Sequence, residues 1–312
     1  MTKVIHSQFI DFNFIKFPII FPLIYFFFLV NYPEYENFII LFTLIFLAEP
    51  HFGATWPFMI NAINKKKFQE EKFNYIFIPI FIILISIILF IYFKLLLYLI
   101  FFVANFYHVT RQSSGISKIY IGRGKDKEIK FHISCIYFFG VLFFIIGFLR
   151  FQLPLIDAEY SLFLNISIII LMLLLILKYL ISYGKENLFV FLTGILIFYP
   201  VCFVDSAIHA IIMGVTMHYS QYIFITFKVN FKRLGELKSD ITAFKGSLSF
   251  IIIILIYGIL MGGLSVFDTF TNIEAGFLII IPLIGQLLHF YYDSLLWKFS
   301  NSHNREVTLK YI

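Results

Sequence analysis

The sequence predicts an all-α, polytopic integral membrane protein with about ten transmembrane helices and both termini on the cytoplasmic side. The first reason is composition, because the 312 residues are 61% hydrophobic and only 13% charged. Soluble domains average about 45–50% apolar and about 25% charged residues. The second reason is arrangement, because the apolar residues form long runs between short loops. These runs leave no room for a soluble domain, so we expect 1–312 to form a single transmembrane helical domain.

Ten segments are predicted to span the membrane, each with about 20 mostly apolar residues, the length that crosses the hydrocarbon core. They are 14–30, 38–63, 74–92, 95–117, 131–150, 160–183, 188–204, 206–228, 246–266 and 275–297. The gap between the seventh and eighth segments is short and follows Pro200. It predicts a tight hairpin or a broken helix at that point.

The charges of the loops predict the orientation of the chain. Loops 64–72, 118–130 and 228–245 are rich in Lys and Arg, whereas loops 31–37 and 267–274 are poor in them. Basic loops stay in the cytoplasm, so both ends of a ten-span chain are expected there. This indicates a multi-pass protein of the bacterial inner (cytoplasmic) membrane. The same sorting explains the net charge of +6 without nucleic acid as a partner.

Five histidines lie within the predicted spans, where polar groups are costly and usually functional. They are His51, His108, His209, His218 and His289. In the predicted topology, all of these except His209 lie within roughly 6 Å of one depth, in the cytoplasmic half of the bilayer. His209 precedes His218 by nine residues, a rise of roughly 13 Å, so the two can share an ion only if Gly214 allows a kink.

Imidazoles that meet at one depth can bind a metal. Four neutral histidines without a thiolate favour a redox-active iron or copper over a structural zinc. Polar groups nearby are expected to orient the rings through their second nitrogen atoms. Those groups are Glu49, Asp205, Gln286 and Asp293. Gln286 and Asp293 share a helix face with His289, and Asp205 shares one with His209.

Four short segments resemble the Brp/Blh-type bacterial membrane β-carotene dioxygenases, in which histidines inside the helices hold iron. Pro50-His51-Phe52-Gly53 resembles an early Pro-His-Gly segment of that family, and Asn105–Gln112 resembles a later segment with one histidine. His218-Tyr219-Ser220 resembles the second half of a His-x3-His pair, and His289–Asp293 resembles the last helix. Two positions depart from the family: Gly214 stands at the first histidine of the pair, and Thr55 stands near an expected aspartate.

This resemblance implies an iron(II)-dependent oxygenase that acts with O2 on a lipophilic, carotenoid-like or lipid-like substrate. The expected metal ligands are His51, His108, His218 and His289, with His209 as a substitute for the missing member of the pair. Tyr222 and Gln112 are the expected catalytic or pocket residues.

Three other readings of these residues remain open. A single intramembrane histidine is often only a hydrogen-bonding group between helices. A proton- or metal-coupled transporter would use Glu49, Arg111, Asp205 and the histidines as a relay. The sequence has no inverted repeat, which weighs against a transporter. A membrane transferase with one histidine as a metal-free base is the third alternative.

Overall fold

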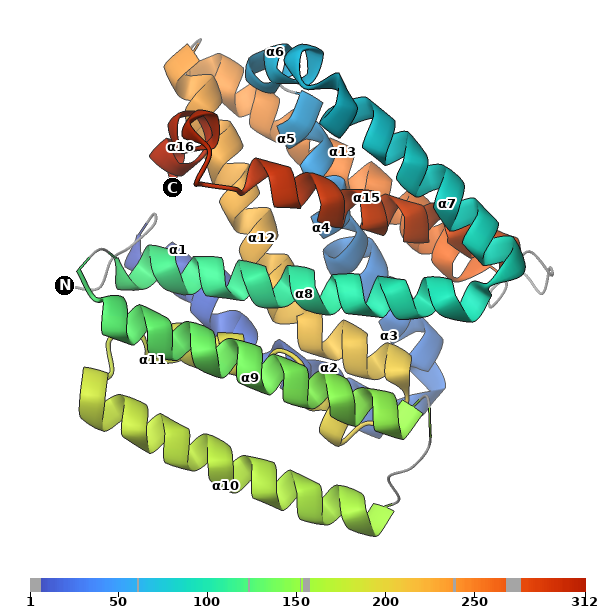
Figure 1. The fold of residues 1–312 in the computed structure, drawn as a ribbon, viewed down its shortest axis with the longest axis vertical. Helices are drawn as coiled ribbons and strands as arrows, with labels where there is room; N and C mark the ends of the chain where they lie inside the picture. Colours follow the sequence, from blue (N-terminus) through green and yellow to red (C-terminus); the bar gives the residue numbers. More distant parts are fainter. Residues whose placement is uncertain are drawn as a thin grey trace. The chain divides into compact units, whose positions relative to one another are not determined.

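The computed structural model describes residues 7–60, 62–122, 124–151, 153, 158–237, 240–267 and 276–312 (Figure 1). Helix is the only regular secondary structure in these ranges. The chain divides into two compact units: Met1–Pro33 with Val109–Gln221, and Glu34–His108 with Tyr222–Ile312. We call them the first and the second unit. Helices α8 (Lys94–Ile121) and α12 (Ala207–Leu237) each contribute residues to both.

Seven helices of the described chain are long and apolar enough to cross a membrane. They are Gln8–Asn31, Pro33–Met59, Phe73–Tyr92, Asp126–Phe151, Leu162–Tyr183, Lys245–Ser265 and Gly276–Leu296. They coincide with seven of the ten predicted segments and confirm a helical protein suited to a membrane. The count of ten and the cytoplasmic position of both termini remain predictions.

The other three predicted segments differ in how they fold. Segment 95–117 lies inside the continuous helix α8, and segment 206–228 lies in α12 except for its first residue. Polar residues interrupt the apolar run in both helices. Segment 188–204 is not one continuous helix, so its prediction as a single span is wrong, whereas the broken helix expected near Pro200 is found. Helix α11 (Leu188–Ile195) has 8 residues, or about 12 Å, and the 3-10 turn η6 (Tyr199–Cys202) follows it. Pro200 lacks a backbone N–H and cannot continue the helix.

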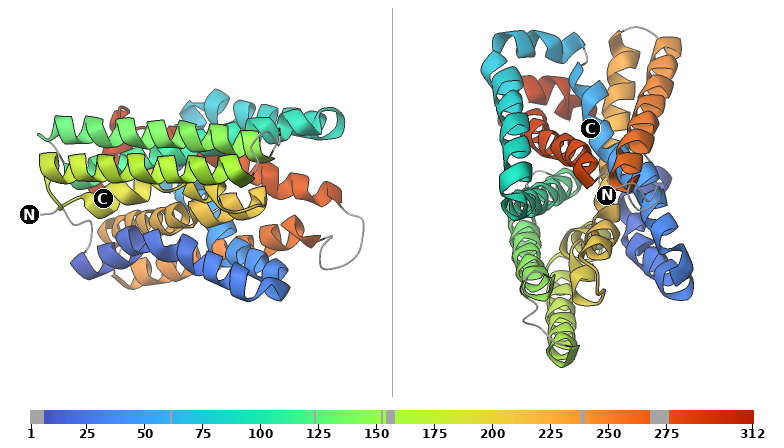
Figure 2. Two further views of the ribbon diagram at one scale, coloured as in Figure 1. Left: turned by 90° about the horizontal axis from the view of Figure 1, so that it is seen from below. Right: turned by 90° about the vertical axis from the view of Figure 1, so that its right-hand side faces the viewer.

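The first unit consists of α1 (Gln8–Asp11), η1 (Phe12–Lys16), η2 (Phe17–Ile20), α2 (Phe21–Asn31), α9 (Asp126–Phe151), α10 (Ala158–Tyr183), α11, η6 and parts of α8 and α12. Helices α9 and α10 run side by side (Figures 1 and 2). The buried Glu128 accepts hydrogen bonds from the Tyr179 hydroxyl at 2.9 Å and from Asn187 Nδ2 at 3.0 Å. Helix α12 is continuous through Gly214, where a side chain would collide with the carbonyl oxygen of Ile197. Gly214 therefore permits close packing against the backbone of Ile197.

The second unit consists of η3 (Pro33–Tyr35), α3 (Glu36–Thr43), η4 (Leu44–Ala48), α4 (Glu49–Gly53), α5 (Thr55–Ile60), α6 (Ala62–Glu70), η5 (Phe73–Phe77), α7 (Ile78–Tyr92), α13 (Asp240–Ser265), η7 (Gly276–Ile279), α15 (Ile280–Leu296), α16 (Ser302–Val307), η8 (Leu309–Tyr311) and parts of α8 and α12. Its described core includes Ala54, Tyr222, Phe250 and Ile254, which join α13 to the second half of α12.

A close approach between α13 and the segment before His51 positions that histidine. The element η4 is a π-helix that ends at Ala48, and Pro50, which has no N–H to donate, is the second residue after it. Gly258 and Gly262 form a small-xxx-small pattern on α13, as at many tight contacts of membrane helices. A Cβ on Gly258 would meet the carbonyl oxygen of Ile45 and lie 2.9 Å from Pro50 Cδ.

Replacing Gly258 by alanine is therefore expected to destabilise the protein by about 1–3 kcal/mol, since the backbone of Ile45 would have to shift. The measurement is the midpoint of thermal unfolding in detergent, compared with the unchanged chain. Gly263→Ala is the matched control, because a Cβ there meets nothing within 4 Å. An equal effect of both substitutions would contradict the close packing.

Candidate metal centre

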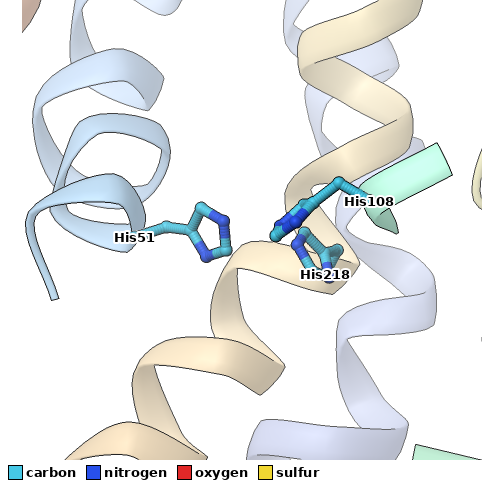
Figure 3. A group of neighbouring side chains, drawn as sticks. All are labelled: His51, His108 and His218. Carbon is cyan, nitrogen blue, oxygen red and sulfur yellow. The ribbon is translucent and has the colours of Figure 1, made fainter. Parts of the chain in front are cut away.

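Three buried histidines of the second unit come together from three helices. His51 belongs to α4, His108 to α8 and His289 to α15. The ring centroids of His51 and His289 are 4.5 Å apart, those of His108 and His289 are 4.7 Å apart, and those of His51 and His108 are 6.1 Å apart. Figure 3 shows the rings of His51 and His108 pointing toward each other. Three of the four histidines expected at one level thus meet inside a single unit.

The closest approach is between the two Nε2 atoms of His108 and His289, at 3.1 Å. Two nitrogen ligands that are each about 2.0–2.1 Å from one metal ion stand about 2.9–3.4 Å apart at octahedral or tetrahedral angles. Without an ion, one of the two nitrogens must carry a proton that the other accepts. The separation therefore suits a shared metal ion as well as a hydrogen bond.

Asp293 adds a carboxylate to the two imidazoles. It follows His289 by four residues on α15, and its Oδ2 lies 3.8 Å from His289 Nε2. His108, His289 and Asp293 each offer one ligand atom, and these atoms lie within 4.8 Å of one another. Two histidines and one carboxylate form the typical ligand set of non-haem iron(II) oxygenases. Asp293 was expected only to orient His289, but its position also makes it a candidate ligand.

The hydroxyl of Thr55 lies within hydrogen-bonding distance of three buried side chains, two of which belong to the candidate ligands His289 and Asp293. Its Oγ1 lies 2.6 Å from His289 Nδ1, 3.0 Å from the Tyr222 hydroxyl and 3.2 Å from Asp293 Oδ1. The Tyr222 hydroxyl also donates to Asp293 Oδ1, at 2.6 Å. If Thr55 donates to that carboxylate, its oxygen accepts the Nδ1 proton of His289. His289 Nε2 then carries a lone pair toward His108, as metal binding requires.

Thr55 was not among the predicted site residues, although its position in the sequence indicates a role beside His51. It is a polar residue in an apolar segment, four positions after His51 and one helical turn away. The expected partners for the second nitrogen of His289 were Gln286 and Asp293. The structure instead pairs Nδ1 of His289 with Thr55.

Gln286 binds a different buried group, the side chain of Glu49. Gln286 Nε2 donates to Glu49 Oε1 at 2.8 Å, and Glu49 is fully buried. The Tyr257 ring packs within 3 Å of the position that a Cβ on Gly53 would take. The hydrogen bond between Glu49 and Gln286 joins α4 to α15. On α4, one helical turn after Glu49, Gly53 leaves room for the ring of Tyr257.

Aromatic side chains surround the three histidines. The ring of Tyr222 lies 4.4 Å from His51, Phe52 lies 5.1 Å from His289, and Phe290 lies 4.7 Å from His108, measured between centroids. Tyr222, predicted from the sequence as a catalytic or pocket residue, thus contacts this centre. These rings give the imidazoles an apolar environment.

The first unit holds His209 and Asp205, and both have other partners there than expected. His209 Nδ1 lies 2.8 Å from the hydroxyl of Tyr25 on α2. Asp205 is exposed and accepts a hydrogen bond from Arg150 Nη2 at 3.2 Å. The expected pairing of Asp205 with His209 is therefore not found. The bond to Tyr25 fits the reading of His209 as a hydrogen-bonding group between helices.

His218 and Gln112 also belong to the first unit, on α12 and α8 (Figure 3 labels His218). His218 is buried and precedes Tyr222 by four residues in a continuous helix. Gln112 follows His108 by four residues in another. Residues at this spacing share a helix face. The sequence-based roles of His218 as a ligand and of Gln112 as a pocket residue therefore stay predictions.

Comparisons with known proteins return nothing for this chain. No protein-family model, curated protein or solved structure matches it. The resemblance to β-carotene dioxygenases thus remains an interpretation of four short segments. Any function has to be argued from the geometry of the centre itself.

Replacement of Thr55 by valine is expected to destabilise the protein by about 1–3 kcal/mol, because His289 and Asp293 each lose a buried hydrogen bond. Thr55→Ser keeps the hydroxyl and is the matched control, expected to stay close to the unchanged protein. Thermal unfolding in detergent without added metal measures both variants. Equal stability of the valine and serine variants would show that the Thr55 hydroxyl does not hold this network.

Proposed function

We propose that this protein is a membrane-embedded, iron(II)-dependent oxygenase that acts on a lipophilic substrate. The observation that carries the proposal is the buried set of His108, His289 and Asp293, whose ligand atoms lie within 4.8 Å of one another. Two neutral imidazoles and one carboxylate suit iron(II) and leave coordination positions open. His51 stands beside this set, and His218 is the further ligand that the sequence suggests.

The residues of the chain have distinct tasks in this proposal. Thr55 keeps the Nδ1 proton of His289 in place, so that Nε2 stays available as a ligand. Tyr222 donates to Asp293 Oδ1, which leaves Oδ2 for the metal. Burial of all three ligands excludes water from the centre. Bound iron(II) would supply the binding and activation of O2.

A lipophilic substrate fits the surroundings of the centre. Phe52, Tyr222 and Phe290 present aromatic rings to the histidines. Pockets for apolar ligands are lined mostly by such side chains, with few polar groups. Membrane helices also give a carotenoid-like or lipid-like molecule direct access from the bilayer, so we expect the substrate to enter from the lipid.

A proton- or metal-coupled transporter is the second candidate function. The fully buried Glu49, bonded to Gln286, is the observation that favours it, since buried acids in membrane helices often belong to proton relays. A transporter would move solute into sealed liposomes without consuming O2. An oxygenase would consume O2 and transport nothing.

Purified protein, loaded anaerobically with iron(II) and freed of excess metal, is expected to retain about one iron per chain. His108→Ala, His289→Ala and Asp293→Asn should each weaken iron binding at least about tenfold, because each removes a ligand. Metal analysis by mass spectrometry gives the readout. His132→Gln is the control, since this buried histidine lies in the first unit against Ser117. Iron retained equally by all variants would place the metal elsewhere or nowhere.

The oxygenase activity is tested with a polyene such as β-carotene in mixed micelles. O2 consumption is expected in the presence of iron(II), should stop when a chelator removes the metal, and should return when iron(II) is restored. Because Asp293 is a proposed iron ligand, Asp293→Asn is expected to lower the rate of O2 consumption. Iron binding without O2 consumption, together with uptake into liposomes, would favour the transporter instead.

A further inference from the structure

The guanidinium of Arg233 is fully buried without a carboxylate partner among the described residues. Arg233 lies on α12 in the second unit, eleven residues after Tyr222. Its Nε donates to the carbonyl oxygen of Val307, and its Nη2 donates to Thr308 Oγ1 at 2.9 Å. Its third nitrogen, Nη1, is buried and has no hydrogen-bond partner in the described part of the chain. Burial lowers the pKa of this side chain to about 10.

His303 lies close enough to both Lys67 and Arg233 for their charges to act on it. Lys67 on α6 is 9% exposed, and His303 on α16 has its Nε2 at 3.2 Å from Asn64 Oδ1. Burial, followed by the charges of Lys67 and Arg233, holds the pKa of His303 below its ordinary value. Glu70 and Glu306 act in the opposite direction, but both are exposed. We call Lys67, Arg233 and His303 the basic cluster.

The contacts around Arg233 hold the guanidinium without neutralising it. Its Cζ lies 4.5 Å from the centroid of the Phe58 ring, which stacks on Trp297 at 5.5 Å and 9°. The two acceptors from the C-terminal segment, Val307 and Thr308, are neutral oxygens. An uncompensated buried charge is costly, so a negative partner for Nη1 would stabilise this arrangement.

We propose that the basic cluster binds a phosphate group, carried by an anionic phospholipid or free in solution. A planar guanidinium with an available Nη1 and a nearby ammonium group are the usual donors to phosphate oxygens. Lys67 and Arg233 directly follow two predicted spans, in loops 64–72 and 228–245, where lipid headgroups meet a membrane protein. Trp297, a residue type enriched at that level, lies in the adjoining stack. This site is separate in chemistry from the proposed metal centre and does not depend on it.

The test uses the purified full-length chain in a nonionic detergent. Native mass spectrometry measures the binding of dioleoyl phosphatidylglycerol, dioleoyl phosphatidylcholine and inorganic phosphate, and thermal unfolding measures the stabilisation by each. The unchanged protein is expected to bind the anionic lipid or phosphate and to discriminate against phosphatidylcholine. Arg233→Gln and Lys67→Gln should weaken this binding at least about tenfold, the value of one charged hydrogen bond.

Lys232→Gln is the matched control, because Lys232 is exposed and directly precedes Arg233 on α12. This substitution removes one positive charge, as Arg233→Gln and Lys67→Gln do. It should bind like the unchanged protein. Saturable binding of inorganic phosphate without lipid identifies a free phosphate as the ligand, whereas binding of phosphatidylglycerol alone identifies a headgroup. If Arg233→Gln does not fold, Lys67→Gln decides the matter, since it leaves Arg233 and its contacts in place. Equal binding of both lipids, or no loss in Lys67→Gln relative to Lys232→Gln, would overturn the proposal.

Discussion

The hydrogen bonds of Thr55 are the interaction on which the candidate centre depends. Inside hydrocarbon, a polar side chain finds no water and has to be satisfied by other parts of the protein. One hydroxyl here meets His289 Nδ1, Asp293 Oδ1 and the Tyr222 hydroxyl together. If Thr55 donates to Asp293, this sharing places the proton of His289 on Nδ1 and leaves two candidate ligand atoms, His289 Nε2 and Asp293 Oδ2, 3.8 Å apart.

The packing of α13 supplies the second constraint on this centre. Because Gly258 has no side chain, the carbonyl of Ile45 and the ring of Pro50 can lie against α13. The π-helix η4 ends at Ala48, two residues before Pro50, and His51 follows Pro50. The approach of His51 to His289 is therefore a result of backbone packing, in which glycine and proline each remove an atom group that would interfere.

The second unit buries two separate groups of polar side chains, which favour ligands of opposite charge. His289 Nε2 lies 3.1 Å from His108 Nε2 and 3.8 Å from Asp293 Oδ2, so these three groups contact each other even before any ligand is considered. Arg233 has neutral partners for two of its nitrogens, and its charge is not balanced by any described carboxylate. The first arrangement suits a metal cation, and the second suits an anion. Opposite charges thus define two candidate sites that different ligands should occupy.

The hydropathy of the segments was enough to predict a helical membrane protein, because a span needs only about 20 apolar residues in a row. The intramembrane histidines could likewise be found by counting, and His51, His108 and His289 do meet. Sequence reasoning went wrong where contacts between helices decide. The partners of His209 and Asp205, which are Tyr25 and Arg150, show this.

The physical reason is that these spans are apolar on all sides, so their periodicity does not show which face meets a neighbour. Length, composition and the depth of a residue along a helix follow from the order of the residues. The rotation of each helix about its axis does not. Only the tertiary structure decided that Thr55 holds His289, that Asp293 turns a carboxylate oxygen toward the same nitrogen, and that Arg233 is buried against Phe58.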